Sequence, residues 1–340
     1  MISKEMAIRI RDSYISGLSD FETYGESFWQ QLDQRKLEVH EILTKGSINS
    51  IVEALSNPSE NELFYGFDET YSSSFYVVNE IGPEELIYSA IWLLAEALGS
   101  IPILNPESTV PVEKPSADEL LSKISNKLLV DITVPKPFPK EFGLKTKFGE
   151  ITYRMVQSLY QSHLVMSNIR KFNLSGKTLL EIGGGLGRNA YNLSKFGVKT
   201  TLVDLPLTQV AAASFLAQTL GEENISLNNE NVKSAIVDFK TPSKLFITSN
   251  QKYTISLNCD SFTEMDQEVA RNYVEFCLNN SDLLVSINHE INSFKVMDLN
   301  TSKRFQLTRN PYWLRPGYAE ELFSRKLRVR SNNNFLRSII

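Results

Sequence analysis

The sequence contains few cysteines and no long run of basic residues. Its only cysteines, Cys259 and Cys277, show no metal-binding spacing. A disulfide framework is therefore not expected, and free thiols in a reducing compartment are the simpler expectation. Long runs of lysine and arginine are also missing, and the net charge is −5. The composition therefore argues against a nucleic-acid-binding surface.

Long apolar segments are missing too. The most apolar stretch, residues 86–95, is ten residues long, whereas a membrane-spanning helix needs about 20. Residues 1–14 carry charges throughout and lack the apolar centre of a signal peptide. We therefore expect no membrane insertion and a cytoplasmic protein.

The most informative segment is residues 178–206, TLLEIGGGLGRNAYNLSKFGVKTTLVDLP. Its pattern predicts a strand, a glycine-rich turn, a helix and a second strand, over residues 178–182, 183–187, 188–196 and 199–203. Asp204 follows the second strand directly. Elements in this order, ending in an acid, form the nucleotide-binding half of a doubly wound sheet.

The glycine turn lacks one feature of a dinucleotide-binding loop. The G-x-G-x-x-G fingerprint needs glycine at its sixth position, which counted from Gly183 is Arg188. The sequence instead reads acid-x-G-x-G-x-G from Glu181, a spacing similar to that of class I S-adenosylmethionine-dependent methyltransferases. Asp204 lies 23 residues after Glu181, close to the offset of about 20 for an acid that binds ribose hydroxyls. A nicotinamide-dependent dehydrogenase is thereby disfavoured.

In methyltransferases of this class the loop packs against the methionine part of the cofactor, and the acid binds the ribose. We therefore predict S-adenosylmethionine as cofactor. The predicted cofactor-binding residues are Glu181, Gly183, Gly184, Gly185, Gly187, Asp204, Leu205, Asp238, Asn258 and Tyr153. Asp238 could equally be a surface acid, and Tyr153 a core residue.

The N-terminal part reads as helices, with apolar spacing that includes Phe28 and Leu32, up to alternating prolines at residues 135–139. We place a domain boundary there, between a mainly helical N-terminal domain and a class I methyltransferase domain, residues 1–135 and 136–340. Downstream we expect strands over residues 225–227, 253–257 and 282–287, helices over 148–172, 208–220 and up to about 278, and a terminal hairpin within 305–327. This alternation predicts an α/β fold, a Rossmann-like and mostly parallel sheet with helices on both faces.

In a doubly wound sheet, ligands bind outside the carboxyl ends of the strands. The candidates there are Asp260 and Glu264 after the fourth strand and His289 after the fifth. Methyl transfer from a sulfonium is an in-line displacement, for which the protein aligns the acceptor oxygen and removes the hydroxyl proton. A neutral imidazole suits that base role near pH 7. His289 is therefore the first candidate base, with Glu290 as an orienting partner.

Each candidate also has a structural interpretation. His289 could be satisfied by backbone at the strand end, and residues 261–264 match a capping box in which Glu264 starts the following helix. For Asp260, a base, a metal ligand and a hydrogen bond to the cofactor all stay open. No Asp-Asp or Glu-Asp pair follows the fourth or fifth strand, so we predict no metal site.

The C-terminal segment offers a second set of candidates. Tyr312 and Trp313 lie between Arg309 and Arg315. They could form an aromatic platform for a sugar ring beside an anion clamp, or pin the terminal hairpin. Both interpretations stay open.

Three motifs together, LLEIGGGLG, TTLVDLP and LNCDSFTEM, resemble the sugar O-methyltransferase family of bacterial surface-polysaccharide clusters. That family shows an E-I-G-G-G-x-G loop, an I/V-D-L-P strand end and an N-x-x-S-F-x-E-M segment. Asn57-Pro58 and residues 65–68 extend the resemblance into the N-terminal part. It implies an active site near residues 258–264, and N-terminal helices that help bind substrate or form a homo-oligomer.

The predicted function is S-adenosylmethionine-dependent methyl transfer to a sugar hydroxyl of a glycan or an activated sugar, in bacterial polysaccharide biosynthesis. One alternative is a methyltransferase of a non-sugar small molecule or natural product. A second is a catalytically inactive methyltransferase fold that serves as a scaffold. The motifs identify the methyl donor and leave the acceptor open.

Overall fold

The computed structural model describes residues 2–19, 36–65, 82–105, 107, 113–139, 142–247, 250–299 and 304–325. The predicted helical spacing at Phe28 and Leu32 and the motif residues 66–68 lie outside these residues. Within the described ranges, no helix is both long enough and apolar enough to cross a bilayer.

The described chain forms one large sheet with the strand order β5-β6-β4-β3-β7-β8-β10-β9. Its strands are β3 (Thr178–Ile182), β4 (Lys199–Val203), β5 (Ile225–Ser226), β6 (Val237–Lys240), β7 (Tyr253–Cys259), β8 (Ser281–His289), β9 (Phe305–Pro311) and β10 (Tyr318–Arg325). Strands β3 to β8 pair in parallel. The hairpin β9–β10 closes one edge, because β10 pairs antiparallel with both β8 and β9.

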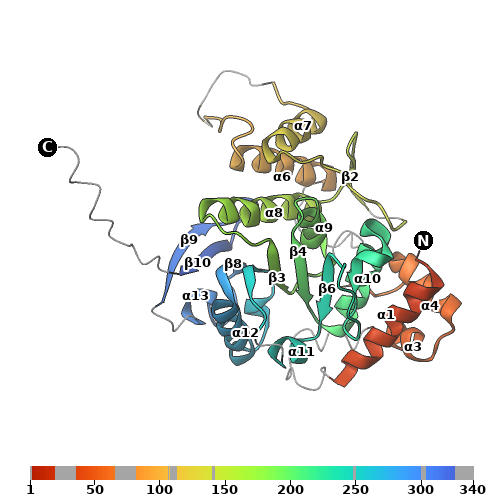
Figure 1. Ribbon diagram of the computed structural model, residues 1–340. Helices are drawn as coiled ribbons and strands as arrows, with labels where there is room; N and C mark the ends of the chain where they lie inside the picture. Colours follow the sequence, from red (N-terminus) through yellow and green to blue (C-terminus); the bar gives the residue numbers. More distant parts are fainter. Residues whose placement is uncertain are drawn as a thin grey trace.

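Helices cover both faces of the sheet (Figure 1). One face carries α8 (Tyr153–Lys171), α9 (Arg188–Ser194) and α10 (Pro206–Leu220), and the other α11 (Pro242–Ile247), α12 (Gln267–Asn280) and α13 (Val296–Leu299). Successive strand residues point to opposite faces, so Leu179 belongs to one buried cluster and Leu180 to the other. This confirms the predicted α/β fold class, a Rossmann-like and mostly parallel sheet with helices on both faces and an N-terminal helical part.

The N-terminal helices form two groups on the same side of the sheet (Figure 1). One group packs against α10 and contains α1 (Lys4–Gly17), α3 (Leu37–Lys45), α4 (Ile48–Ser56) and the 3-10 turn η2 (Pro58–Glu60). The other packs against α8 and contains α6 (Pro83–Ala97) and α7 (Ala117–Leu128). Arg9 of α1 binds Glu230 through two hydrogen bonds of 2.7 and 2.8 Å. The proposed boundary between residues 135 and 136 stays a prediction.

Two expected elements need correction. The strand beside β4 is β6, and the expected strand at 225–227 is reduced to the two-residue edge strand β5. The long helix begins at Tyr153 rather than at residue 148, because the preceding residues form a short hairpin of β1 (Leu144–Thr146) and β2 (Gly149–Ile151). Thr152 then caps α8 by accepting a hydrogen bond from the Met155 amide.

Candidate functional site

A cleft of about 480 Å³ lies at the carboxyl ends of the parallel strands. The strand order reverses between β3 and β7, because the chain runs outward from β3 through β4 and β6 before it returns to β7. Such a switch point is where open α/β sheets bind ligands. The glycine loop after β3 and the segments after β4, β7 and β8 line the cleft, together with side chains of α8 and of the β9–β10 connection.

Three glycines allow the loop after β3 to turn sharply. Gly183, Gly185 and Gly187 have φ values of +71°, +55° and +85°, a region that costs other residues strain. Gly183 is also tightly enclosed, because an added Cβ would lie 2.2 Å from Ser261 Oγ. The backbone of the loop thus touches the segment after β7, and Gly183, Gly184 and Gly185 line the cleft.

The acid after β4 is joined to this loop. The Asp204 carboxylate accepts hydrogen bonds from the amides of Gly185 (2.9 Å) and Leu205 (2.8 Å). Gln209 donates to the Asp204 carbonyl oxygen (2.9 Å) and so fixes the backbone behind it. The carboxylate therefore lines the cleft at a defined position beside the glycine loop.

Glu181 is the acid within β3. It lines the same end of the cleft and is 2% exposed. Its Oε1 accepts a hydrogen bond from Asn189 Nδ2 (2.8 Å), whereas its Oε2 is buried without a hydrogen-bond partner among the described residues. Burial raises the pKa of Glu181 to about 8, and the charge of Asp204 adds to this rise. A cationic ligand group would remove this penalty.

The cleft includes six of the predicted cofactor residues, namely Glu181, Gly183, Gly184, Gly185, Asp204 and Leu205. Four others do not line it, namely Tyr153, Gly187, Asp238 and Asn258. Asp238 is the second residue of β6 rather than a residue beyond its end, and its carboxylate lies 3.9 Å from Lys240 Nζ. The side chain therefore lies along the sheet and does not reach the cleft.

The remaining three have structural roles. Tyr153 is buried, with its hydroxyl 3.3 Å from the Leu314 carbonyl oxygen. Gly187 precedes α9 and packs against Leu216. Asn258 is fully buried, and its contacts lie within the framework behind the cleft.

That framework is a network of two buried asparagines. Asn258 Nδ2 donates to the Ile182 carbonyl oxygen (3.0 Å) and to Ser261 Oγ (2.5 Å). Asn288 Nδ2 donates to Asn258 Oδ1 (2.8 Å), while Asn288 Oδ1 accepts from the Ser261 amide (3.1 Å). These bonds join the carboxyl ends of β3, β7 and β8, and so position the residues that follow Asn258 and Asn288.

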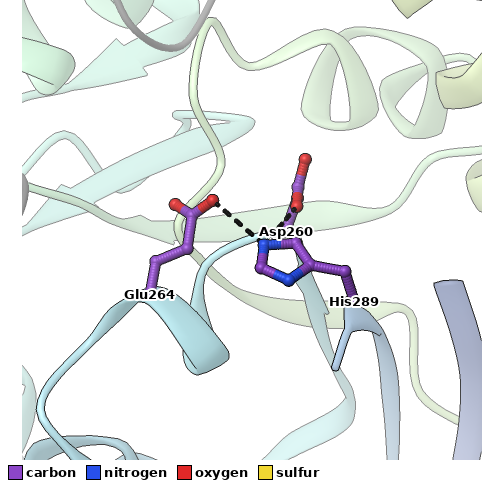
Figure 2. A group of neighbouring side chains, drawn as sticks. All are labelled: Asp260, Glu264 and His289. Carbon is purple, nitrogen blue, oxygen red and sulfur yellow. Dashed lines mark ion pairs between the residues drawn. The ribbon is translucent and has the colours of Figure 1, made fainter. Parts of the chain in front are cut away.

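Asp260, Glu264 and His289 converge at the other end of the cleft (Figure 2). His289 Nε2 lies 3.6 Å from Glu264 Oε1 and 3.9 Å from Asp260 Oδ1. One nitrogen and two carboxylate oxygens lie within 4.8 Å of one another. Such a group can take up a proton or bind a cation.

Asp260 is held by groups from three other parts of the chain. Its Oδ1 accepts a hydrogen bond from the Tyr318 hydroxyl (2.8 Å), and its Oδ2 one from Arg315 Nη1 (3.0 Å). Arg154 Nη1 of α8 lies 3.6 Å from Oδ2. Tyr318 is paired with His289 across β10 and β8, and the two rings meet edge to face at 5.5 Å. Asp260 also has a φ of +58°, a strained backbone for a residue other than glycine.

The structural interpretation of Glu264 does not hold. Residues Phe262–Glu264 form a separate 3-10 turn, and α12 is capped by Asp266, which accepts from the amides of Glu268 and Val269. Ser261 is instead engaged in the asparagine network. Glu264 is therefore not needed to start α12.

The surroundings of His289 also differ from the expectation. Its Nδ1 is buried without a hydrogen-bond partner among the described residues. Glu290 pairs with Arg309 (2.7 Å) and Lys295 (3.7 Å). The acids near Nε2 are thus Glu264 and Asp260.

Of the four C-terminal candidates, two line the cleft and two do not. Arg315 and the buried Tyr312 line the cleft, whereas Trp313 is 43% exposed and does not. Arg309 binds Glu290 and Glu321 away from the cleft.

The contributors that were not predicted from the sequence include Arg154, Tyr318 and Asn288. Arg154 stands on a helix more than a hundred residues before Asp260, so no local spacing relates the two. Asn288 gave a weak signal, as a buried polar residue at the end of an apolar strand.

No protein-family model matches the chain, and no curated protein sequence matches it. Among solved structures, a magnesium protoporphyrin IX methyltransferase from Synechocystis with bound SAM is 13% identical, with 49% of this chain and 79% of that chain covered and a TM-score of 0.37. An O-methyltransferase family protein from Burkholderia thailandensis is 12% identical (51% and 59% covered, TM-score 0.35). A TehB-like SAM-dependent methyltransferase from Corynebacterium glutamicum is 13% identical (49% and 87% covered, TM-score 0.37).

Similarities this low carry no argument about what the chain binds. What the chain binds is therefore inferred from the geometry of the cleft. The resemblance to sugar O-methyltransferases stays a prediction.

Gly183 and Gly197 form a matched pair for testing the enclosure of the glycine loop. Both have a φ of +71°, but an added Cβ meets Ser261 at Gly183 and nothing within 4 Å at Gly197. We expect Gly197→Ala to lower the free energy of unfolding by about 1–2 kcal/mol through backbone strain alone. Gly183→Ala should cost about 1–3 kcal/mol more through overpacking. Equal costs in urea unfolding would contradict the enclosure.

The raised pKa of Glu181 predicts a pH dependence of stability. Between its ordinary pKa of 4.5 and about 8, the unfolded chain releases the Glu181 proton while the folded chain retains it. This contribution to stability is complete below pH 4.5 and is lost as the pH rises to about 8. Glu181→Gln removes the loss, so we expect its free energy of unfolding, relative to the wild type, to increase from pH 5 to pH 8. Glu275→Gln, on the exposed side of α12, serves as control. A constant difference across this range would show that Glu181 is charged throughout.

Proposed function

We propose that this chain is an S-adenosylmethionine-dependent O-methyltransferase, with a sugar hydroxyl of a glycan or activated sugar as acceptor. One observation carries the proposal. A single cleft joins the glycine loop, Glu181 and Asp204 at one end to Asp260, Glu264 and His289 at the other. Donor and acceptor would therefore meet in one cleft, as a direct transfer requires.

The donor end suits this cofactor in shape and charge. The loop offers bare backbone for close approach, and the Asp204 carboxylate can exchange its bonds to the amides of Gly185 and Leu205 for bonds to ribose hydroxyls. S-adenosylmethionine carries an ammonium and a sulfonium group. The buried carboxylate of Glu181 supplies the complementary negative charge. The bound cofactor supplies the electrophilic methyl group.

The acceptor end suits a hydroxyl nucleophile. Methyl transfer needs the acceptor oxygen in line with the methyl carbon, and the hydroxyl proton has to leave. The group of Asp260, Glu264 and His289 can take up the proton directly on the imidazole, or can hold a cation that acidifies the hydroxyl.

The rest of the acceptor end supports a sugar as substrate. It is lined by side chains that hydrogen-bond hydroxyl groups, among them Gln157, Gln161 and Arg154, and by the aromatic rings of Tyr312 and Tyr318. Polar groups beside aromatic faces are suited to a sugar ring, with its hydroxyl rim and apolar faces. The donor end does not distinguish a sugar from a compact polar acceptor of another class, because it would bind only the cofactor.

Asp204 and Asp238 provide a test of the donor site. We expect Asp204→Ala to weaken the binding of S-adenosylhomocysteine by at least about 10-fold, because hydrogen bonds to a charged group are lost. Asp238→Ala should leave the affinity unchanged, because Asp238 does not line the cleft. Isothermal titration calorimetry measures both. Absence of binding to the wild type, or an unchanged affinity in Asp204→Ala, would refute the proposed donor.

His289 provides a test of the chemistry. In a screen of nucleotide sugars, glycan fragments and non-sugar alcohols, we expect turnover on a sugar acceptor. We expect His289→Asn to lower kcat by about 100-fold or more without weakening S-adenosylhomocysteine. Turnover on non-sugar acceptors alone would favour the first alternative. Cofactor binding without turnover on any acceptor would favour a scaffold protein.

A further inference from the structure

The spacing of Asp260, Glu264 and His289 is unusual for a hydrogen-bonded group. His289 Nε2 lies 3.6 Å from Glu264 Oε1 and 3.9 Å from Asp260 Oδ1 (Figure 2), too far for hydrogen bonds. Two atoms that bind one ion at about 2.1 Å can be up to about 4.2 Å apart. Both separations satisfy this limit. The third pair lies within 4.8 Å, which a small rotation of Glu264 would shorten.

The charges at this point also favour a cation. Two carboxylate oxygens lie close to one another and to the imidazole Nε2, and two negative charges repel unless a positive charge lies between them. The guanidinium groups near Asp260 lie at its other oxygen, with Arg315 Nη1 at 3.0 Å and Arg154 Nη1 at 3.6 Å from Oδ2. They partly neutralise the Asp260 carboxylate at Oδ2. Its Oδ1 is the atom that lies nearest the imidazole.

The surroundings hold the three atoms in place. The Tyr318 hydroxyl donates to Asp260 Oδ1 at 2.8 Å, as outer hydrogen bonds commonly do for metal-binding carboxylates. Asn258 and Asn288 connect the strand ends from which Asp260 and His289 project. The group is therefore arranged before any ligand binds.

We propose that Asp260, Glu264 and His289 bind a divalent cation. One imidazole nitrogen with two carboxylate oxygens suits Mn²⁺ or Zn²⁺ better than Ca²⁺, which takes oxygen ligands alone. This revises the expectation of no metal site. That expectation considered only acids adjacent in sequence, whereas the fold gathers ligands from positions 260, 264 and 289.

The role of the cation rests on the proposed methyl transfer, whereas its binding does not. A cation held by Asp260, Glu264 and His289, which all line the cleft, would bind the acceptor hydroxyl and lower its pKa. The O–H bond breaks and the proton passes to water. The electron pair of the oxygen forms the new C–O bond, and the C–S pair stays on sulfur. His289 is then a ligand rather than the base.

The test is a titration of the chelator-treated full-length protein with Mn²⁺, followed by electron paramagnetic resonance. We expect one Mn²⁺ per chain, with nitrogen coupling from the imidazole in the spin-echo spectrum. Glu264→Gln and His289→Asn should each weaken binding by at least about 10-fold, and His289→Asn should abolish the nitrogen coupling. Glu290→Gln is the matched control, since Glu290 adjoins His289 but pairs with Arg309 and Lys295.

The outcomes are distinguishable. No binding of Mn²⁺ or of Zn²⁺ by the wild type, or equal affinity in Glu264→Gln, overturns the site. Circular dichroism and S-adenosylhomocysteine binding of each variant exclude loss of folding as the cause. If Mn²⁺ binds as expected but S-adenosylhomocysteine does not, the proposed function fails and the cation site stands. If turnover persists at full rate in a chelator and no Mn²⁺ binds, the cation site alone fails.

Discussion

The buried amide pair of Asn258 and Asn288 is the constraint on which both ends of the cleft depend. Neighbouring parallel strands are held by backbone hydrogen bonds along their length, up to the pairs Ile182–Asn258 and Cys259–Ile287. At the carboxyl ends of these strands, the side-chain amides of Asn258 and Asn288 add further hydrogen bonds. They bind the Ile182 carbonyl oxygen, Ser261 and each other. Because an unpaired buried amide is costly, the network favours one arrangement of the three strand ends.

This arrangement explains why the donor and acceptor ends are coupled. Ser261 lies between them, bound to Asn258 on one side and packed against Gly183 on the other. The loop that would receive the cofactor therefore touches the segment that carries Asp260 and Glu264. A side chain at position 183 would push both apart, so the glycine serves packing as well as backbone conformation.

The charges in the cleft indicate that function is obtained at some cost in stability. Glu181 is buried with a raised pKa, and Asp260 adopts a positive φ. Neither feature favours folding. A positive group of the cofactor would remove the penalty at Glu181, and the binding of a cation beside Asp260 would offset the cost of its backbone strain. Strain and burial of this kind are expected where a site is arranged in advance for its ligands.

The sequence by itself determined the fold class and the group of Glu181, the glycine loop and Asp204, because these depend on contiguous spacing. Glu181, the glycines and Asp204 belong to one strand–turn–helix–strand unit, and their predicted strands agree with β3 and β4. The tertiary structure decided the rest. Asp238 and Asn258 were predicted to bind the cofactor, but their exact place along a strand decides whether they reach the cleft, and sequence patterns locate strand ends only approximately. The group of Asp260, Glu264, His289, Arg154 and Tyr318 exists only because parallel pairing, the β9–β10 hairpin and α8 bring distant segments to one edge of the sheet.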